Sequence, residues 1–313
     1  MRVAVSGPDS NTTSVYADFY NLHADAGVKD GDLAARQSNI NQVADYIATW
    51  SKGNAVFVFG DFNSRYSRAA DTAIRELLAS VNNNGPLMKD PWIEIERSDV
   101  APTAETFCTN PSTNNYCETV DKSYYRSSPL MTIQAEDFAY ASKLFLQADG
   151  NILSDHNPVK VNFTWTAGAT LQQSRFWGGP HGTWFSDVPA LAKVSKPKAS
   201  LLMFRGGSRL DSVGLTLTDG TRFAHGGSGG SQVSLALGPS EYWVAAELCQ
   251  AQKDGRTRNF YIRATTSTGR TLQAGTVTKD CVVFSAPRGW QIVGFLGQDG
   301  NEVDQLAFVY APQ

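Results

Sequence analysis

Residues 54–65 read Asn-Ala-Val-Phe-Val-Phe-Gly-Asp-Phe-Asn-Ser-Arg, an apolar run that changes abruptly into polar residues. Residues 54–59 form a short run rich in Val and Phe, and Gly60 ends it. A short apolar run bounded by turn residues is typical of a buried strand. Asp61 and Asn63 follow two positions apart, so on an extended path they point to the same side. This pair predicts either a site for a cation or a phosphate, or a simple turn.

Composition and charge limit the class of protein. The 313 residues are 42% hydrophobic and 18% charged, which is typical of a globular chain long enough for two domains. No apolar run approaches the roughly 20 residues that cross a membrane. Residues 1–171 hold 13 Lys and Arg against 20 Asp and Glu, whereas residues 172–313 hold 14 against 10. The acidic first half argues against non-specific nucleic-acid binding and suits a site that recruits a divalent cation.

An α/β pattern surrounds the opening strand. Residues 14–23 mix aromatic with small polar residues and predict a strand that ends at His23. Asp32 then caps a helix whose apolar residues keep helical spacing as far as Gly53. With residues 54–59 this makes strand, helix, strand, the pattern of a layered α/β domain. We expect a second helix and four further strands at residues 71–81, 119–126, 131–135, 138–146 and 159–165.

The second half has no helical periodicity. Strand-like runs recur between glycine-rich turns, and this regular spacing predicts an all-β barrel or prism. Residues 166–170 are small and featureless, as expected for a linker. The expected strands are residues 199–205, 213–218, 233–237, 242–249, 259–265, 281–285, 290–296 and 305–310.

The four cysteines fall into two groups. Cys108 and Cys117 bracket a loop of turn-forming residues, which predicts a disulfide and an oxidising compartment. Cys249 and Cys281 lie far apart in the second half and are candidates for a second pair. We therefore expect a secreted protein, although residues 1–7 are too short and too polar for a secretory signal. A leader would have to lie upstream of Met1.

Six polar residues stand at the ends of expected elements. Each has a structural explanation of its own, such as a core histidine, a surface ion pair or a turn. Together they match the needs of a metal-assisted phosphodiesterase: a histidine base oriented by a carboxylate, a second histidine near the phosphate, and carboxylates for Mg²⁺. The positions are His23, Asp61 with Asn63, Asp121, and Asp155 with His156.

Four motifs in this order resemble the endonuclease/exonuclease/phosphatase superfamily, which includes deoxyribonuclease I, apurinic endonucleases and neutral sphingomyelinases. The motifs are Asn21-Leu22-His23, Gly60-Asp61-Phe62-Asn63-Ser64, Val120-Asp121-Lys122 and Ser154-Asp155-His156-Asn157-Pro158-Val159. The resemblance implies a four-layered α/β sandwich for residues 1–166.

The resemblance also implies a role for each residue. His156 would be the general base and Asp121 its orienting partner. His23 would contact the phosphate or act as an acid, and Asp61 with Asn63 would hold the nucleophile and the phosphate. Mg²⁺ or a similar cation would be held by Asp61 and Asp155.

The chain also departs from this family. Its members begin with strands that carry an Asn and a Glu that bind the metal, but only 22 residues precede His23 here, and they contain no Gln-Glu motif. The only acids among them are Asp9 and Asp18. The chain therefore resembles the C-terminal half of the family's domain. We expect weak or absent metal-dependent activity from the chain as given.

Residues 174–313, after a linker at 167–173, resemble a jacalin-type lectin domain. The resemblance implies a β-prism of three four-stranded sheets. It is carried by four stretches: residues 176–187, which include Phe-Trp-Gly-Gly-Pro-His-Gly, then residues 209–213, residues 225–230 and residues 294–306.

In that family the sugar lies between the first glycine loop and a Gly-x-x-x-Asp loop near the C-terminus. Gly179 and Gly300-Asn301-Glu302-Val303-Asp304 fit these positions. The carboxylate of Asp304 can accept two sugar hydroxyls beside backbone N–H groups of residues 300–303. Hairpin turns are the alternative, and we favour turns for the glycines at 226–230. The motif does not distinguish mannose from galactose.

Two functions follow from these resemblances. The first is a secreted phosphodiesterase-type hydrolase that a lectin domain tethers to glycans, with a phospholipid head group or nucleic acid as substrate. The second is a carbohydrate-binding lectin that carries an inactive phosphodiesterase half domain.

Overall fold

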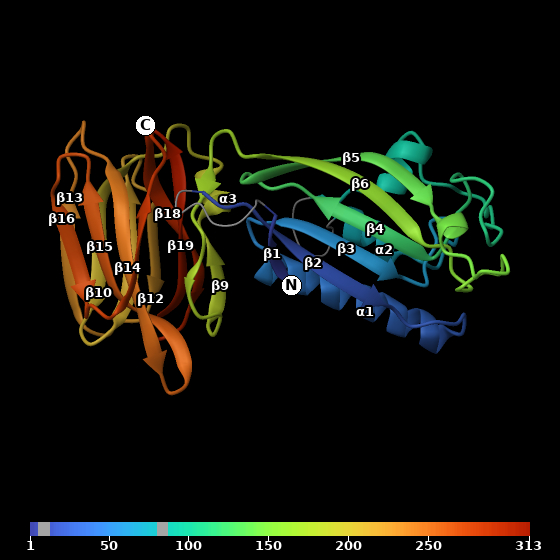
Figure 1. Ribbon diagram of the computed structural model, residues 1–313, viewed down its shortest axis with the longest axis horizontal. Coiled ribbons are helices and arrows are strands. Elements are labelled where there is room, and N and C mark those ends of the chain that lie inside the picture. Colours follow the sequence, from blue (N-terminus) through green and yellow to red (C-terminus); the bar gives the residue numbers. More distant parts are fainter. Residues whose placement is uncertain (6–12, 80–86) are drawn as a thin grey trace. The chain divides into compact units, whose positions relative to one another are not determined.

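The computed structural model describes residues 1–5, 13–79 and 87–313, which form two compact units (Figure 1). The first comprises Met1–Val3 and Ala17–Thr166, and the second comprises Ala4–Tyr16 and Ala167–Gln313. The described residues of the segment Ala4–Tyr16 join the second unit because Ser14 N donates to Gln173 O at 2.9 Å and the Tyr16 ring contacts Phe176. The expected linker also belongs to this unit, since Leu171 is buried.

The first unit is layered around one sheet. Among the described residues four strands form it, in the order β1 (Arg2–Ala4), β2 (Tyr16–His23), β3 (Ala55–Asp61) and β4 (Asp121–Arg126). Strands β2 and β3 are parallel, and β4 is antiparallel to β3.

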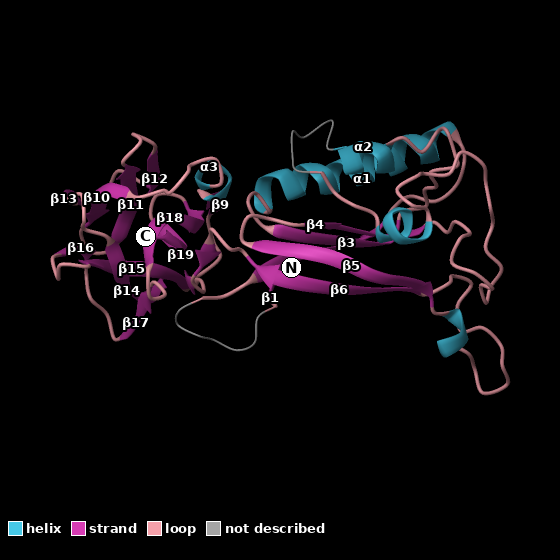
Figure 2. Cartoon of the chain, turned by 90° about the horizontal axis from the view of Figure 1, so that it is seen from above, coloured by secondary structure: helices cyan, strands magenta, loops and turns pink. Residues whose placement is uncertain are grey.

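Helices cover one face of this sheet and a two-stranded sheet covers the other (Figure 2). The helices are α1 (Asp30–Trp50) and α2 (Ala73–Ala79), and the outer strands are β5 (Met131–Tyr140) and β6 (Val159–Ala167). A short π-helix, η1 (Trp92–Glu96), and a 3₁₀ turn, η2 (Ser142–Leu144), lie in the connections. This arrangement confirms the predicted α/β class.

Strand β3 explains the layering through its alternating side chains. Val56 and Val58 are fully buried in the core under α1, where they join Ile40 and Ile47. Phe57 points to the opposite face, where it stacks on Phe19 at 4.9 Å and meets Phe163 of β6 edge-on at 5.0 Å between ring centroids. The alternation of Val and Phe therefore supplies both faces of the sheet.

Several boundaries differ from the sequence prediction. Helix α1 begins at Asp30, and Asp32 caps it from inside the first turn by accepting the Lys29 N–H at 3.0 Å. The two strands predicted at 131–135 and 138–146 are one strand, β5, which ends at Tyr140, and the predicted strand is wrong beyond that residue, where η2 follows. Strand β5 continues past the exposed Glu136 and Asp137, and Phe138 is buried again. Helix α2 ends at Ala79, and residues 80 and 81 of the predicted helix lie outside the described residues.

The described part of the second unit forms three sheets, as the predicted β-prism requires. The first contains β12 (Arg222–Gly226), β11 (Leu210–Leu217), β10 (Ala199–Gly206) and β13 (Ser231–Ala236) in that order. The second contains β16 (Thr271–Gly275), β15 (Arg256–Thr266), β14 (Trp243–Lys253) and β17 (Asp280–Ser285). The third contains β7 (Gln172–Gln173), β19 (Val303–Pro312), β18 (Trp290–Asp299) and β9 (Thr183–Ser186), with β8 (Trp177–Gly178) also pairing with β19.

Aromatic side chains fill the centre of this unit. Trp243 is fully buried and packs within 5.9 Å of the Phe204, Phe295 and Phe308 rings, measured between centroids. Within the described part of the unit, the only helix is α3 (Val188–Leu191). The all-β prediction for the second half is confirmed.

The cysteine predictions are also confirmed, because Cys108 is bonded to Cys117 and Cys249 to Cys281. The second pair joins directly opposed residues of β14 and β17. No helix among the described residues is both long and apolar enough to cross a bilayer.

The sheet of the first unit depends on Gly60, and this is testable. Gly60 has φ +136°, and a Cβ there would lie 2.0 Å from the Leu22 carbonyl oxygen of β2. We expect Gly60→Ala to lower the free energy of unfolding by at least about 2 kcal/mol, measured by chemical denaturation. Gly31→Ala is the matched control. Gly31 lies in α1 with nothing near its Cβ position, so this change should stabilise by about 1 kcal/mol. Equal stability of Gly60→Ala and the parent protein would contradict the account.

Candidate functional sites

Three predicted site residues lie in one row across the sheet of the first unit. His23 of β2 is paired directly with Asp61 of β3, and Asp61 is paired directly with Asp121 of β4. Directly opposed residues in a sheet place their side chains on the same face. Strand register therefore brings together residues that are 38 and 60 positions apart in the sequence.

His156 completes this group from a loop before β6. Its Nδ1 lies 2.9 Å from Asp121 Oδ2 and 3.1 Å from Oδ1, so the imidazole N–H donates to the carboxylate. The hydrogen bond to Asp121 raises the pKa of His156 above its ordinary value. Burial, aided by the charge of Asp61, raises the pKa of Asp121 although the bond to His156 opposes it. Nε2 of His156 is left to act on a ligand.

The two carboxylate oxygens of Asp61 have different roles, one in a turn and one in the candidate site. Oδ1 accepts the N–H of Asn63 at 2.7 Å, which closes a tight turn after β3. Oδ2 lies 3.8 Å from His23 Nε2 and 3.9 Å from His156 Nε2, and accepts no hydrogen bond from the described residues. The two interpretations of this stretch, turn and site, therefore both hold at Asp61.

Asn63 holds the ends of β2 and β3 together. It adopts a left-handed backbone conformation with φ 47°, and its Nδ2 donates to the carbonyl of Ala24 at 2.9 Å. The N–H of Ala24 in turn donates to Asp61 O at 2.8 Å. The side-chain oxygen of Asn63 is the part that could contact a ligand. Its contact with a nucleophile or phosphate stays a prediction.

Asp155 lies outside the cluster that could hold a metal. Among the described residues that cluster consists of Asp61, Asp121 and His156, whose ligand atoms lie within 4.8 Å of one another. Asp155 is exposed, whereas Asp61 is mostly buried. Of the two predicted metal ligands, Asp61 belongs to this cluster, and a metal contact by Asp155 stays a prediction.

The cluster offers few donor atoms to a hard cation. Both carboxylate oxygens of Asp121 accept hydrogen bonds from His156, and Oδ1 of Asp61 accepts one from Asn63. Asp61 Oδ2 is therefore the carboxylate oxygen of these residues that has no hydrogen-bond donor. Mg²⁺ prefers six oxygen ligands but commonly keeps several waters and takes one or two carboxylates from the protein. The residues present fit such a loosely held cation, with Asp61 as its ligand.

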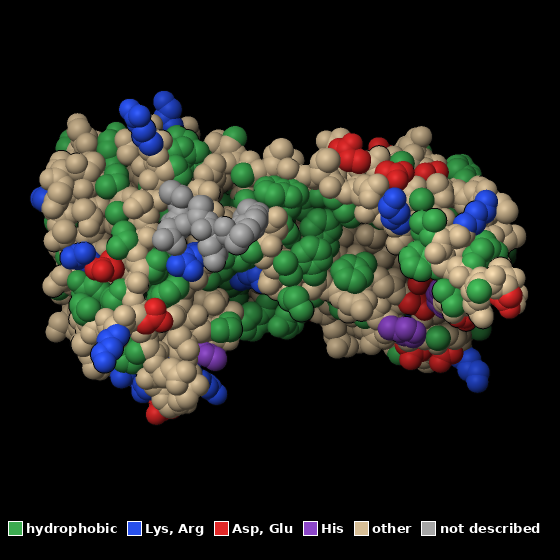
Figure 3. Space-filling model, viewed as in Figure 1, with side chains coloured by type: hydrophobic (Ala, Val, Ile, Leu, Met, Phe, Trp, Pro, Cys, Tyr) green, Lys and Arg blue, Asp and Glu red, His purple; other side chains and the backbone are tan. Residues whose placement is uncertain are grey.

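Surface exposure makes the site accessible. The side chain of His23 is 76% exposed and that of His156 is 41% exposed. Figure 3 shows histidine side chains beside acidic ones at one place on the first unit.

Asn157 fixes the loop that carries His156, a role the sequence interpretation did not assign. Its buried Oδ1 accepts the Ser112 N–H at 3.0 Å, and its Nδ2 donates to Thr109 O at 3.0 Å. Both partners lie in the loop closed by the disulfide between Cys108 and Cys117. The position of Asn157 beside His156 in the fourth motif was the available signal.

A buried ion pair supports the opposite side of β4. Lys122 Nζ lies 2.9 Å from Glu118 Oε1, and both side chains are nearly inaccessible. Glu118 also accepts the N–H groups of Tyr66 and Ser67 at 2.6 and 3.2 Å. The bonds from Lys122 and Ser67 lower the pKa of Glu118 although its burial opposes this. The pair ties the segment after Asn63 to the strand that carries Asp121.

The predicted carbohydrate site of the second unit is centred on Asp304. Asp304 is 3% exposed, its carbonyl accepts the N–H of Gly179 at 3.0 Å, and a Cβ on Gly182 would lie 2.6 Å from its Oδ2. The absence of a side chain at 182 therefore leaves Oδ2 open towards the glycine loop. Burial raises the pKa of Asp304 although Arg258 opposes the shift.

Arg258 is a feature of this site that the sequence interpretation missed. Its Nη1 lies 2.6 Å from Asp304 Oδ1, so one of the two oxygens expected to bind sugar hydroxyls already has a partner. No local motif signals this contact, because β15 and β19 belong to different sheets.

The remaining predicted residues of the loop are mainly structural. Glu302 is buried, and its Oε1 forms ion pairs with Arg209 Nη2 at 2.5 Å and with Lys253 Nζ at 3.1 Å. Val303 is fully buried. Gly300 N donates to Glu302 O at 3.0 Å, which closes the turn, and Asn301 is exposed.

Comparison with known proteins identifies the first unit. Residues 3–162 match the family model "Endonuclease/Exonuclease/phosphatase family 2". The chain is 36% identical over 150 residues to sphingomyelinases of Mycobacterium bovis and Mycobacterium tuberculosis, a match over 48% of this chain and 28% of theirs. It is also 26% identical over 156 residues to secreted RxLR effector protein 19 of Plasmopara viticola, covering 47% of this chain and 84% of that protein.

The second unit matches a lectin family. Residues 174–309 match the family model "Jacalin-like lectin domain". Similar solved structures include a mannose-binding jacalin-related lectin from Ananas comosus, with 22% identity, a TM-score of 0.40, and coverage of 46% of this chain and 99% of that one. Frutapin from Artocarpus incisa gives 19% identity, a TM-score of 0.40, and coverage of 46% and 99%.

The family matches agree with the layered α/β unit and with the three sheets of the all-β unit. The chain spans little more than a quarter of the length of the mycobacterial relatives. It belongs to the endonuclease/exonuclease/phosphatase family and carries a jacalin-like lectin domain in its second half.

Proposed function

We propose that this protein is a metal-dependent phosphodiesterase-type hydrolase that its lectin domain tethers to glycans. The observation that carries the proposal is the pair of His156 and Asp121 beside Asp61 and His23. Family membership supports hydrolysis of a phosphoester, and the family generally uses divalent cations.

The hydrogen-bonded pair of His156 and Asp121 fits general-base catalysis. Asp121 holds Nδ1–H of His156, so the other ring nitrogen, Nε2, is the one that can take a proton from an attacking water. The raised pKa of His156 strengthens it as a base but also means that it must lose its own proton first. Activity that depends on His156 as a base should therefore increase as the pH rises through the pKa of this residue.

His23 and Asp61 fit the phosphate side of the site. His23 is exposed and lies 3.8 Å from Asp61 Oδ2, so a phosphate oxygen could be held by its imidazole. A divalent cation at Asp61 would neutralise negative charge on the phosphate oxygens. Asn63 keeps the Asp61 turn in shape.

The substrate class follows from the relatives named above. A phospholipid head group is the substrate we propose first, because the relatives at 36% identity are sphingomyelinases. Nucleic acid is the alternative phosphodiester. The two disulfides support an extracellular location, where glycans also occur.

One observation favours a second function. Among the described residues the catalytic cluster provides one uncommitted carboxylate oxygen, at Asp61, which is a weak basis for binding a cation. The buried Asp304 carboxylate keeps Oδ2 open beside Gly182. The alternative function is therefore a lectin whose phosphodiesterase unit is inactive.

Hydrolysis separates the two functions. Purified chain should cleave sphingomyelin in liposomes weakly in Mg²⁺ and not in EDTA, with choline phosphate release as the measure. His156→Ala should reduce this rate by about 100-fold, since it removes the base. The matched control is His225→Ala, because His225 lies in the lectin unit and should leave the rate unchanged. A Mg²⁺-dependent rate that survives His156→Ala contradicts the proposed mechanism, and the absence of any Mg²⁺-dependent rate supports the lectin alternative.

The Asp121–His156 hydrogen bond can be tested without activity. In metal-free buffer, Asp121→Asn should lower the pKa of His156, because the negative partner that raises it is replaced by a neutral one of the same shape. NMR titration of the imidazole signals measures this shift. The assignment is refuted if the His156 titration curve does not move.

Carbohydrate binding is tested at Asp304. The chain should be retained on mannose or galactose resin, and Asp304→Asn should weaken binding at this site by about tenfold or more, because it removes a charged acceptor of sugar hydroxyls. Asp219→Asn is the control, since Asp219 lies in an exposed turn between β11 and β12. Unchanged affinity at the Asp304 loop would show that the sugar does not contact this carboxylate.

A further inference from the structure

The start of β15 holds Arg258 beside the first glycine loop of the second unit. A Cβ on Gly179 would lie 2.4 Å from the Thr257 carbonyl oxygen, so the backbone just before Arg258 touches this loop. Just after Arg258, Asn259 is fully buried, and its Nδ2 donates to the Trp177 carbonyl at 3.0 Å. The arginine is therefore fixed from both sides at the candidate carbohydrate site.

The guanidinium of Arg258 has unused hydrogen-bond donors. Within the described part of the chain it donates one hydrogen bond, from Nη1 to Asp304 Oδ1 at 2.6 Å. Its Nε is buried without a partner, Nη2 makes no hydrogen bond to the same residues, and the side chain is 19% exposed. A guanidinium offers five N–H groups, and buried donors normally have acceptors. The site therefore has room for an acceptor from a ligand, and a negatively charged acceptor binds such donors most strongly.

His181 is a second donor at this place. A Cβ on Gly179 would lie 2.7 Å from its Nε2, so the imidazole lies against the glycine loop. The residue is exposed, and its ring makes no hydrogen bond to the described residues. Burial raises the pKa of Asp304, and the charges of Arg258 and His181 oppose this rise, so both groups lie near the Asp304 carboxylate.

Basic side chains balance the acidic ones around the site. A lone carboxylate would repel an anion, but a carboxylate paired with a cation does so much less. Three acidic residues act on one another here, and each of the three basic residues pairs with one of them. The group consists of Asp299, Glu302 and Asp304 with Arg209, Lys253 and Arg258.

We propose that the Asp304 site prefers acidic sugars and takes a hexuronate pyranoside. A ring hydroxyl donates to Asp304 Oδ2, which Gly182 leaves open, and the sugar carboxylate accepts hydrogen bonds from Arg258 and His181. This inference rests on the carbohydrate binding proposed for Asp304.

The chemistry of a hexuronate matches the arrangement of the site. Its C4 hydroxyl and the carboxylate on C5 are neighbouring substituents of the ring, just as Asp304 and Arg258 are neighbours in the protein. A planar carboxylate also fits the planar fork of a guanidinium. A neutral hexose carries a hydroxymethyl group in place of the carboxylate and leaves the charged donors of Arg258 without an anionic acceptor.

The test compares each acidic sugar with the neutral sugar of the same configuration. Methyl β-D-glucuronide is paired with methyl β-D-glucoside, and methyl α-D-galacturonide with methyl α-D-galactoside. The full chain, labelled with ¹⁵N, is titrated at low ionic strength, and the shift of the Gly182 amide signal gives the Kd. We expect at least one acidic sugar to bind about tenfold more tightly than its neutral partner, and the difference to shrink as salt is added.

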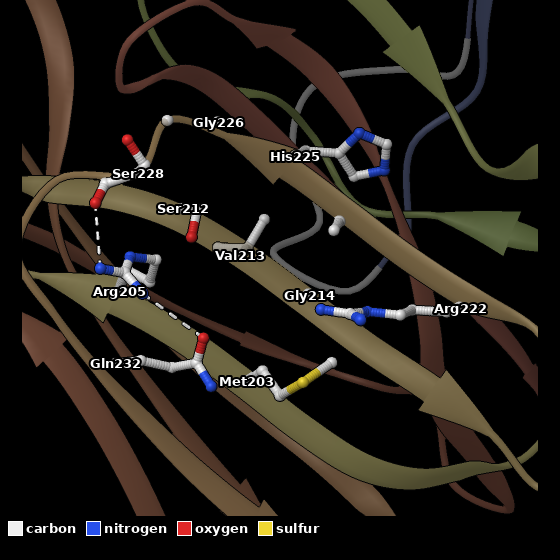
Figure 4. A pocket seen from close by; sticks show the side chains of 12 residues that line it. Met203, Arg205, Ser212, Val213, Gly214, Arg222, His225, Gly226, Ser228 and Gln232 are labelled. Carbon is white, nitrogen blue, oxygen red and sulfur yellow. Dashed lines mark hydrogen bonds between the residues drawn. The ribbon is translucent and has the colours of Figure 1, made fainter.

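Arg258→Gln should remove this preference, because it removes the charged donors and leaves Asp304 able to accept from hydroxyls. Arg222→Gln is the matched control, since it makes the same change of charge elsewhere in the unit. Arg222 is exposed on β12 and lines a pocket of about 290 Å³ whose lining includes neither Asp304 nor Arg258 (Figure 4). The control should keep the full preference for the acidic sugar.

The outcomes separate this inference from the proposed lectin function. Equal binding of acidic and neutral sugars at Gly182 overturns the preference and leaves the lectin function intact. No response of Gly182 to any of the four sugars overturns both. A preference that survives Arg258→Gln overturns the role of Arg258.

If Arg258→Gln disturbs the fold, as its amide spectrum would show, His181→Gln is the second variant. His181 is exposed, so its replacement should leave the fold unchanged. This variant should weaken binding of the acidic sugar by about threefold or more and spare the neutral one. Unchanged binding of the acidic sugar would then contradict the proposal.

Discussion

The register between β2, β3 and β4 is the constraint on which the candidate active site depends. Side chains alternate along a strand, so a slip of one residue would turn Asp61 to the helix side of the sheet and separate it from His23 and Asp121. Gly60 protects this register, because the Leu22 carbonyl occupies the space that any side chain at 60 would need. The position of the Asp61 carboxylate is thus set by a backbone contact one residue away.

The rest of the first unit holds that row of residues in place from two sides. Asn157 ties the His156 loop to the disulfide-closed loop, and the buried pair of Lys122 and Glu118 ties β4 to the segment after Asn63. A buried ion pair contributes little net stability but is costly to break, which makes it suited to fixing a geometry. The positions of Asp121 and His156 therefore depend on residues outside their own hydrogen bond.

Backbone geometry also repeats among the three described sheets of the lectin unit. A bulge and a left-handed glycine recur in all three of its described sheets, and the bulged residue differs from sheet to sheet. Asp304 and Asp211 supply a carboxylate, whereas Phe260 supplies an apolar ring.

Much of this could be predicted from sequence because the signals are local. The alternation of Val56, Phe57 and Val58 gave a strand with two buried faces, and the polar residues at strand ends gave His23, Asp61 and Asp121. The contact between Arg258 and Asp304 was not predictable, since it joins strands of different sheets. Asp155 was expected beside the metal only because it precedes His156, and adjacent residues of a loop need not face the same way. The break expected within β5 was wrong because the strand continues through Glu136 and Asp137, which are both exposed.

The proposed activity depends on Asp61 binding a cation beside His23 and His156. Addition of Mn²⁺ to the full chain, followed by the imidazole proton signals, measures this directly, because the paramagnetic ion broadens nearby nuclei. The account predicts selective broadening of His23 and His156 over His181 and His225, and its loss in Asp61→Asn. Equal broadening of all four histidines, or broadening unchanged by Asp61→Asn, would contradict it.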